Sequence, residues 1–152
     1  MDSRVRAVLS KVASTVEFVG VKFDNVNATN AFGDNALHCV CLWGDVESAA
    51  MLIDAGIDIE KFGDRGYTPL HIACMAGHFA VVELLVRNGA DLFAQSKGEL
   101  PLTTARASGH DMIFDYLVPV MKSTLLGRRN AYIKSRLDQL RSEISGLEAI
   151  LG

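Results

Sequence analysis

The sequence predicts an all-α repeat protein, a solenoid in which pairs of short helices stack against one another. A pattern of apolar residues and glycines recurs every 32 to 33 residues along the middle of the chain. Within one period, the segment 78–88 carries Val and Leu at positions that cover more than one side of a helix. A single helix pair cannot bury such a surface, so stacked copies are required.

The clearest period is 63–95. Pro69 begins its first helix, where a missing N–H costs nothing, and Gly77 ends that helix. The second helix is expected over 78–88, with Gly89 directly after it. Residues 68–73, Thr-Pro-Leu-His-Ile-Ala, match the T-P-L-H-x-A core of the ankyrin repeat, so the chain resembles the ankyrin-repeat family. The resemblance implies helix-turn-helix units with β-hairpin loops that bind another protein through a concave face.

Neighbouring periods repeat these landmarks. Thirty-three residues earlier, Leu37-His38 and Gly44 occupy the equivalent positions. Thirty-two residues later, Pro101-Leu102 and Gly109-His110 do so. The resemblance is therefore expected to cover three repeats.

The third repeat is atypical at its end. Met121 stands where the earlier repeats have glycine, and Pro119 is expected to interrupt the second helix. The predicted organisation is an ankyrin-repeat domain over 1–121, made of a cap (1–29) and repeats 30–62, 63–95 and 96–121, followed by an amphipathic helix over 122–152.

An N-terminal helix is predicted over Ser3 to Val19, with Asp2 or Ser3 as its N-cap. Residues 25–28, Asn-Val-Asn-Ala, align one period before 58–61 and resemble the end of an ankyrin unit. The helix is therefore interpreted as part of a degenerate capping repeat. A mitochondrial presequence is the alternative, which Glu17 and the direct continuation into the repeats disfavour.

Charge is distributed unevenly along the chain. Residues 1–22 carry four basic and two acidic groups, residues 23–121 five and thirteen, and residues 122–152 six and three. The acidic repeats disfavour nucleic acid and favour a protein partner with a basic or mixed surface, unless the acidic groups only confer solubility. With no long apolar run, a soluble, cytoplasmic protein without a membrane span is expected.

Neither a cofactor, a metal site nor a catalytic group is predicted. The histidines follow the repeat period, which favours a structural role. The motifs G-x-S-x-G, G-x-x-x-x-G-K-[ST], H-E-x-x-H and C-x-x-C, which are typical of hydrolases, nucleotide-binding proteins and metal or redox sites, do not occur. Cys39, Cys41 and Cys74 are interpreted as reduced core thiols rather than a disulfide or metal site.

The resemblance to ankyrin proteins assigns partner contacts to the loop tips and to the residues before each helix-ending glycine. Large side chains at such positions, Phe32, Trp43, Tyr67 and Met75, are predicted to form a binding patch. Trp43 could instead pack against the N-terminal cap. The full predicted partner-binding set is Phe32, Asp34, Leu42, Trp43, Asp64, Arg65, Tyr67, Met75, Lys97 and Glu99.

The C-terminal segment carries a heptad pattern from Leu126 onward, with Asn130 as one polar position. A parallel homodimer would place Arg136 against Arg141, whereas antiparallel pairing brings Ile144 against Leu140. Alternatively, the helix folds back and caps the third repeat. The predicted oligomerisation or capping residues are Ile133, Leu137, Leu140, Ile144, Leu147 and Leu151.

The predicted function is protein binding through the concave face. One form of it is an inhibitor that covers its partner, such as an immunity protein against a toxin, by analogy with short, free-standing bacterial ankyrin proteins. The alternative is an adaptor or scaffold that dimerises through the C-terminal helix. An enzyme or enzyme subunit is the third hypothesis, and it is disfavoured by the missing motifs.

Overall fold

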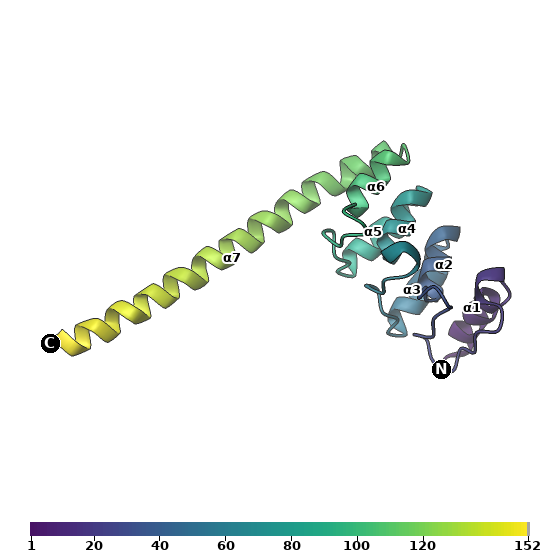
Figure 1. Ribbon diagram of the computed structural model, residues 1–152, viewed down its shortest axis with the longest axis horizontal. Helices are drawn as coiled ribbons and strands as arrows, with labels where there is room; N and C mark the ends of the chain where they lie inside the picture. The colour runs from purple at the N-terminus through teal and green to yellow at the C-terminus, as the bar shows by residue number, and fades with distance from the viewer. Residues whose placement is uncertain (152) are drawn as a thin grey trace. The chain divides into compact units, whose positions relative to one another are not determined.

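The computed structural model describes the backbone of residues 1–151 and the side chains of residues 1–145. Two compact units make up the chain: Met1–Leu117, and a second unit that begins at Val118. Each is described separately. The first unit holds the stacked helices, and the second consists of helix alone (Figure 1).

In the described part of the chain, seven α-helices form in order, joined by loops and two short 3₁₀ turns. Their bounds are α1 (Ser3–Ala13), η1 (Val16–Phe18), α2 (Ala36–Trp43), α3 (Val46–Asp54), η2 (Asp64–Gly66), α4 (Pro69–Ala76), α5 (Phe79–Arg87), α6 (Pro101–Ala107) and α7 (Asp111–Leu151).

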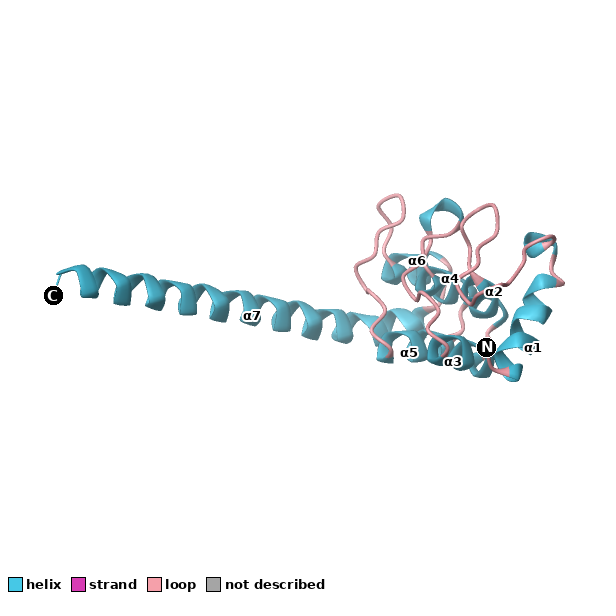
Figure 2. Cartoon of the chain, turned by 90° about the horizontal axis from the view of Figure 1, so that it is seen from below, coloured by secondary structure: helices cyan, strands magenta, loops and turns pink. Residues whose placement is uncertain are grey.

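The helices of the first unit form two rows. The inner helices α2, α4 and α6 pack side by side, the outer helices α3 and α5 do the same, and α1 packs against α2 and α3 (Figure 1). Loops project beyond the inner row on the side away from α3 and α5 (Figure 2). This arrangement is the ankyrin-type solenoid that the sequence predicted.

The first turns of α2 and α4 are each held by the side chain of the residue before the helix. The Thr68 hydroxyl accepts from the His71 N–H (3.5 Å), and the Asn35 amide oxygen accepts from the Leu37 N–H (3.1 Å). Both residues use short polar side chains to satisfy N–H groups that have no partner within the helix. Asn35 therefore replaces the usual Thr of this motif without loss of the cap.

The core is continuous across the repeats because each inner helix contributes small or branched residues to its neighbours. Its largest fully buried members are Phe18, Leu37, Leu52, Leu70, Leu85, Ile113 and Leu117, together with His71. Their burial supplies the stabilisation that no single repeat could obtain alone.

The N-terminal helix is shorter than the sequence predicted. α1 ends at Ala13 rather than Val19, because the Ser14 and Thr15 hydroxyls donate to main-chain oxygens of its last turn (2.7 and 2.8 Å). The chain then turns so that Phe18 becomes buried while Val16 is 87% exposed. The cap thus presents η1, rather than a continued helix, to the first repeat.

The expected interruption at Pro119 is also wrong. α7 runs from Asp111 through Pro119 and Met121 as one helix. Proline removes one hydrogen bond, to the carbonyl of Asp115, and the turns on both sides keep theirs. The second helix of the third repeat therefore continues directly into the second unit. Over residues 1–151, no helix has the length and apolar content needed to cross a membrane.

Candidate functional site

Three loops in front of the inner helices are each closed by a main-chain hydrogen bond. Asn30 donates to the oxygen of Asp34, Gly63 to Tyr67 and Ser96 to Glu99, each at 2.9 Å. These bonds form tight hairpin-like turns, with isolated β-bridges in the first and third. The loop tips that the sequence assigned to partner contacts are thereby held in a defined conformation.

Adjacent loops are linked by a ladder of polar contacts. The Asp64 N–H donates to Asp34 Oδ1 (2.9 Å), and the Ser96 hydroxyl donates to the main-chain oxygen of Arg65 (2.7 Å). Asp34 also accepts from Asn30 Nδ2 (3.2 Å). The carboxylate of Asp34, which belongs to the predicted partner-binding set, is thus engaged in joining two loops.

His38 and His71, which lie on α2 and α4, add contacts to the main chain of the next loop. Nε2 of His38 lies 3.1 Å from the main-chain oxygen of Tyr67, and Nε2 of His71 lies 3.3 Å from that of Glu99. Burial lowers the pKa of both imidazoles, against hydrogen bonds to main-chain carbonyls that raise it. A neutral ring with its proton on Nε2 fits these partners, which confirms the structural role predicted from the period.

The other two histidines tie each repeat to the preceding one. Nε2 of His78 lies 3.0 Å from the oxygen of Leu42, and Nε2 of His110 lies 3.0 Å from that of Met75. Each ring packs over the helix-ending glycine of the earlier repeat. The C-terminal turns of α2 and α4, which carry Leu42 and Met75, are consequently fixed relative to each other.

An apolar groove, here called the repeat groove, opens beside these two turns. Leu42 is 52% exposed and Met75 is 37% exposed, although both are large and apolar. The groove encloses ≈ 180 Å³ and is lined by Glu17, Phe18, Asp34, His38, Cys39, Leu42, Trp43, Ile72 and Met75.

Trp43 contributes to the groove and also contacts the cap. Its side chain is half-buried, and the Lys11 ammonium of α1 lies 4.6 Å from the centre of its ring. A cation over an aromatic face is an attractive contact. Trp43 therefore contacts the cap and also lines the groove, and its part in partner binding stays a prediction.

Of the predicted binding residues, the structure brings Asp34, Leu42, Trp43 and Met75 into one groove. Phe32 lies on the adjacent loop and is 64% exposed. The remaining residues lie along the other two loops and do not line the groove: Asp64, Arg65, Tyr67, Lys97 and Glu99.

Tyr67 is engaged by its own neighbours. Its hydroxyl donates to Glu99 Oε2 (3.4 Å), and its ring lies 5.4 Å from that of His71. Arg65, which has a positive φ of 56°, pairs with Asp64 at 3.7 Å. The second loop therefore turns its tyrosine toward the third loop instead of toward Trp43.

Five groove residues lie outside the predicted binding set: Glu17, Phe18, His38, Cys39 and Ile72. Phe18 and Glu17 come from η1, whose position depends on where α1 ends, and the sequence pattern did not indicate that end. Ile72 lies three residues before Met75, one helical turn away, so its place in the same stripe could have been inferred from spacing alone.

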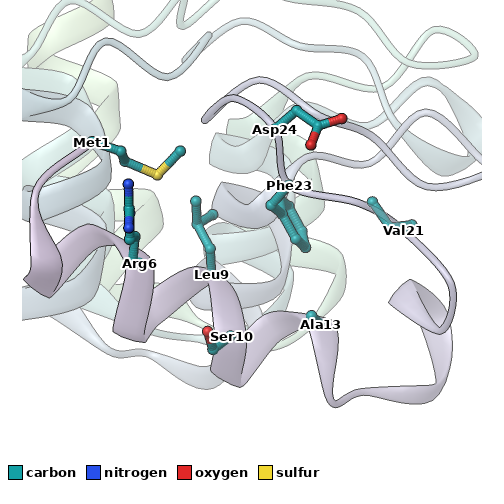
Figure 3. A pocket seen from close by; sticks show the side chains of 8 residues that line it. All are labelled: Met1, Arg6, Leu9, Ser10, Ala13, Val21, Phe23 and Asp24. Atoms are coloured by element: carbon teal, nitrogen blue, oxygen red, sulfur yellow. The ribbon is translucent and has the colours of Figure 1, made fainter.

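A separate hollow of ≈ 460 Å³ lies between α1 and the loop 21–24 (Figure 3). The side chains of Leu9 and Phe23 face this space, and the Phe23 ring stacks on that of Phe18 at 5.8 Å. Phe23 therefore covers the buried end of the core. None of the lining residues belongs to the predicted binding set.

The thiols lie in the core and are free. Burial raises the pKa of Cys39 to about 11 and that of Cys74 to about 12, and it also raises the pKa of Cys41. Among the described residues, no group of three or more His, Cys, Asp or Glu side chains is placed to hold a metal ion. Leu147 and Leu151 of the predicted heptad lie outside the residues whose side chains are described.

Comparison with known proteins gives a family match. A family model described as ankyrin repeats, in three copies, matches residues 5–96 and 60–124. The chain is 34% identical to the human SMC5-SMC6 complex localization factor protein 1 over 138 residues, which is 86% of this chain and 13% of the relative.

Shorter matches cover other kinds of protein. The mouse protein phosphatase 1 regulatory subunit 27 is 34% identical over 85 residues, 55% of each chain. The tyrosine-protein kinase HTK16 of Hydra vulgaris is 37% identical over 89 residues, 57% of this chain and 12% of the relative. The chain thus spans between about a tenth and about half of the length of these curated relatives.

Proposed function

The chain belongs to the ankyrin-repeat family, and we propose that it binds a partner protein through the repeat groove and the neighbouring tip residue Phe32. Ankyrin repeats form a protein-interaction module, and the differing names of the relatives fit a module that serves several kinds of protein. The proposed role is non-catalytic.

One observation carries the proposal: Leu42 and Met75 are exposed at equivalent positions of consecutive repeats. The scaffold leaves this position open, and its backbone is already held by His78 and His110. An apolar side chain in water gains free energy when a partner covers it, on the order of 25 cal/mol per Å² of buried apolar surface. A preorganised pair of such side chains therefore favours association.

The charges around the groove indicate the chemistry of the partner. Glu17 and Asp34 line its edge, and the segment 23–121 carries thirteen acidic and five basic groups. We expect a partner surface with apolar side chains flanked by Lys or Arg, since opposite potentials accelerate encounter and exclude acidic partners.

The test is quantitative affinity capture from cells of the native host with the double variant Leu42→Ala/Met75→Ala. Met112→Ala is the matched control, because Met112 is 74% exposed and lies on α7, outside the groove. We expect a partner retained by wild type and control to be lost from the double variant. All three proteins must unfold at the same temperature. Retention by all three would contradict the proposal.

An adaptor suits the relatives that are named a localization factor and a regulatory subunit. An occluding inhibitor, such as an immunity protein, would use the same groove. The effect of bound chain on the partner's own activity separates the two, because an inhibitor abolishes it and an adaptor leaves it unchanged. The three free thiols suit a reducing compartment such as the cytoplasm.

A further inference from the structure

The helix of the second unit carries an apolar stripe that a lone helix cannot bury. Its members recur at alternating steps of three and four residues, interrupted by Asn130, and each is exposed by 37% to 56%. Long helices in proteins obtain most of their stability by packing such a stripe against a neighbour. The apolar members with described side chains are Leu126, Ile133, Leu137, Leu140 and Ile144.

We propose that this stripe pairs with the same stripe of a second copy of the chain, in an antiparallel coiled coil. Leu137 of each copy then lies opposite Leu140 of the other, and Ile133 lies opposite Ile144. By symmetry, these contacts give four successive apolar layers between residues 133 and 144. They contain neither a polar residue nor a glycine.

Flanking charges decide against a parallel pair. In a parallel pair, the residues that flank the seam meet as Arg136 with Arg141 and as Arg129 with Lys134. Both contacts join like charges, and each occurs twice. Like charges at these positions oppose pairing, so the parallel arrangement is disfavoured.

The antiparallel register instead places Arg136 of one copy beside Glu143 of the other, again twice. On a single helix, both side chains already bond Gln139, at 2.9 and 3.1 Å, so they line one edge of the stripe. The opposite edge brings Lys134 near Arg141, a repulsion reduced by Asp138, which lies 3.9 Å from Arg141 on its own helix. Charge complementarity therefore favours this orientation.

The positions of Asn130 and Arg141 distinguish between the possible antiparallel registers. Shifting the pair by one heptad toward the N-terminus places Asn130 opposite Leu140 and leaves only two successive apolar layers, which are Ile133 with Leu137 and the symmetry-related contact. The register centred on residue 142 makes Arg141 face itself, which opposes two like charges. Pairing about residues 138 and 139 keeps Asn130 outside the four apolar layers, opposite position 147, and does not set Arg141 against itself.

The first experiment measures the mass of the full chain by analytical ultracentrifugation over a range of concentrations. We expect a dimer for the wild type and a monomer for Leu137→Asp. Ser135→Asp, which adds the same charge on the side of the helix away from the stripe, should remain dimeric. A monomeric wild type, or equal dimerisation of both variants, would overturn the proposal.

Charge reversal tests the orientation. Arg136→Glu should weaken the antiparallel dimer roughly tenfold in Kd, because two attractive surface pairs become repulsive. Glu143→Arg should act alike, and the double variant should restore the wild-type Kd. Stronger dimerisation of Arg136→Glu would indicate a parallel pair and overturn the proposed orientation.

The same variants would also show whether the helix instead caps the repeats of its own chain. In that case, Leu137→Asp would lower the unfolding temperature of a protein that is monomeric with or without the substitution. This outcome would also overturn the proposal. Neither outcome bears on partner binding at the repeat groove, which the Leu42→Ala/Met75→Ala variant tests separately.

Discussion

The ammonium group of Lys11 lies 4.6 Å from the centre of the Trp43 ring and joins the N-terminal helix to the last residue of α2. Trp43 also lines the repeat groove. A substitution of Trp43 therefore disturbs the cap and the groove together, so loss of binding by that variant would not by itself locate the site.

We accordingly predict that Trp43→Ala lowers the free energy of unfolding by about 2 kcal/mol, less than a fully buried Trp would cost. Lys11→Met should cost about 0.5 kcal/mol, because it removes an exposed cation–π contact together with an exposed ion pair to Asp45. Urea denaturation at neutral pH measures both. Unchanged stability of Trp43→Ala would mean that its packing against the cap contributes nothing.

Gly44 lies directly against the ring of His78, which leaves no room for a side chain at this position. It has a φ of 73°, and a Cβ there would lie 2.5 Å from Nδ1 of His78. Gly56 has a similar φ of 82° but has nothing within 4 Å of an added Cβ. Comparing substitutions at these two glycines therefore separates the cost of the left-handed backbone from the cost of a clash with the His78 ring.

We predict that Gly56→Ala costs about 1 kcal/mol, from the left-handed backbone alone. Gly44→Ala should cost at least about 1 kcal/mol more, because the His78 ring must move and its bond to Leu42 is lost. Thermal unfolding of the two variants gives the comparison. Equal losses would show that the His78 contact is dispensable.

Because the imidazoles of His38 and His71 are buried, we predict that the folded protein loses stability in mild acid. The pKa of His38 and His71 lies below the ordinary 6.5, so the unfolded chain takes up protons before the folded chain does. Stability is therefore complete above about pH 6.5 and falls as the pH decreases below it. Carboxylates such as Asp45, whose ordinary value is 3.8, act only at lower pH.

Denaturant unfolding at several pH values measures this slope. His71→Asn should be less stable at neutral pH, yet it should lose less stability on acidification, because one of the two imidazoles is gone. An unchanged slope in this variant would contradict the assignment to His71.

Thiol reactivity should report on the fold. Because burial raises the pKa of Cys39 to about 11 and that of Cys74 to about 12, we expect slow labelling by a thiol reagent in the native state. Cys39, 9% exposed, should react before Cys41 and Cys74, and all three should react at once in denaturant. Rapid native labelling of Cys74 would contradict its burial.

The same thiols should also reduce the stability of the protein at alkaline pH. Their ordinary pKa is 9.0, so thiols of the unfolded chain ionise above that value while the folded core keeps them protonated. Unfolding is then favoured progressively as the pH rises above about 9.

The sequence by itself determined the repeat architecture, because its determinants are local. The Thr-Pro-Leu-His core carries its own helix cap and start, and the period places Leu42 and Met75 at equivalent exposed positions. The structural role of His38 and His71 also followed from their period. Partner contact by the predicted residues stays a prediction.

Only the tertiary structure decided what joins these local units. It ends α1 early and thereby brings Phe18 and Glu17 to the groove, engages Asp34 with the next loop, and carries α7 through Pro119. Each of these outcomes depends on groups far apart in sequence or on competition between neighbouring hydrogen bonds. A single-sequence pattern records periodicity and caps, whereas the choice between a continued helix and a turn depends on local hydrogen bonds and on packing that the pattern leaves open.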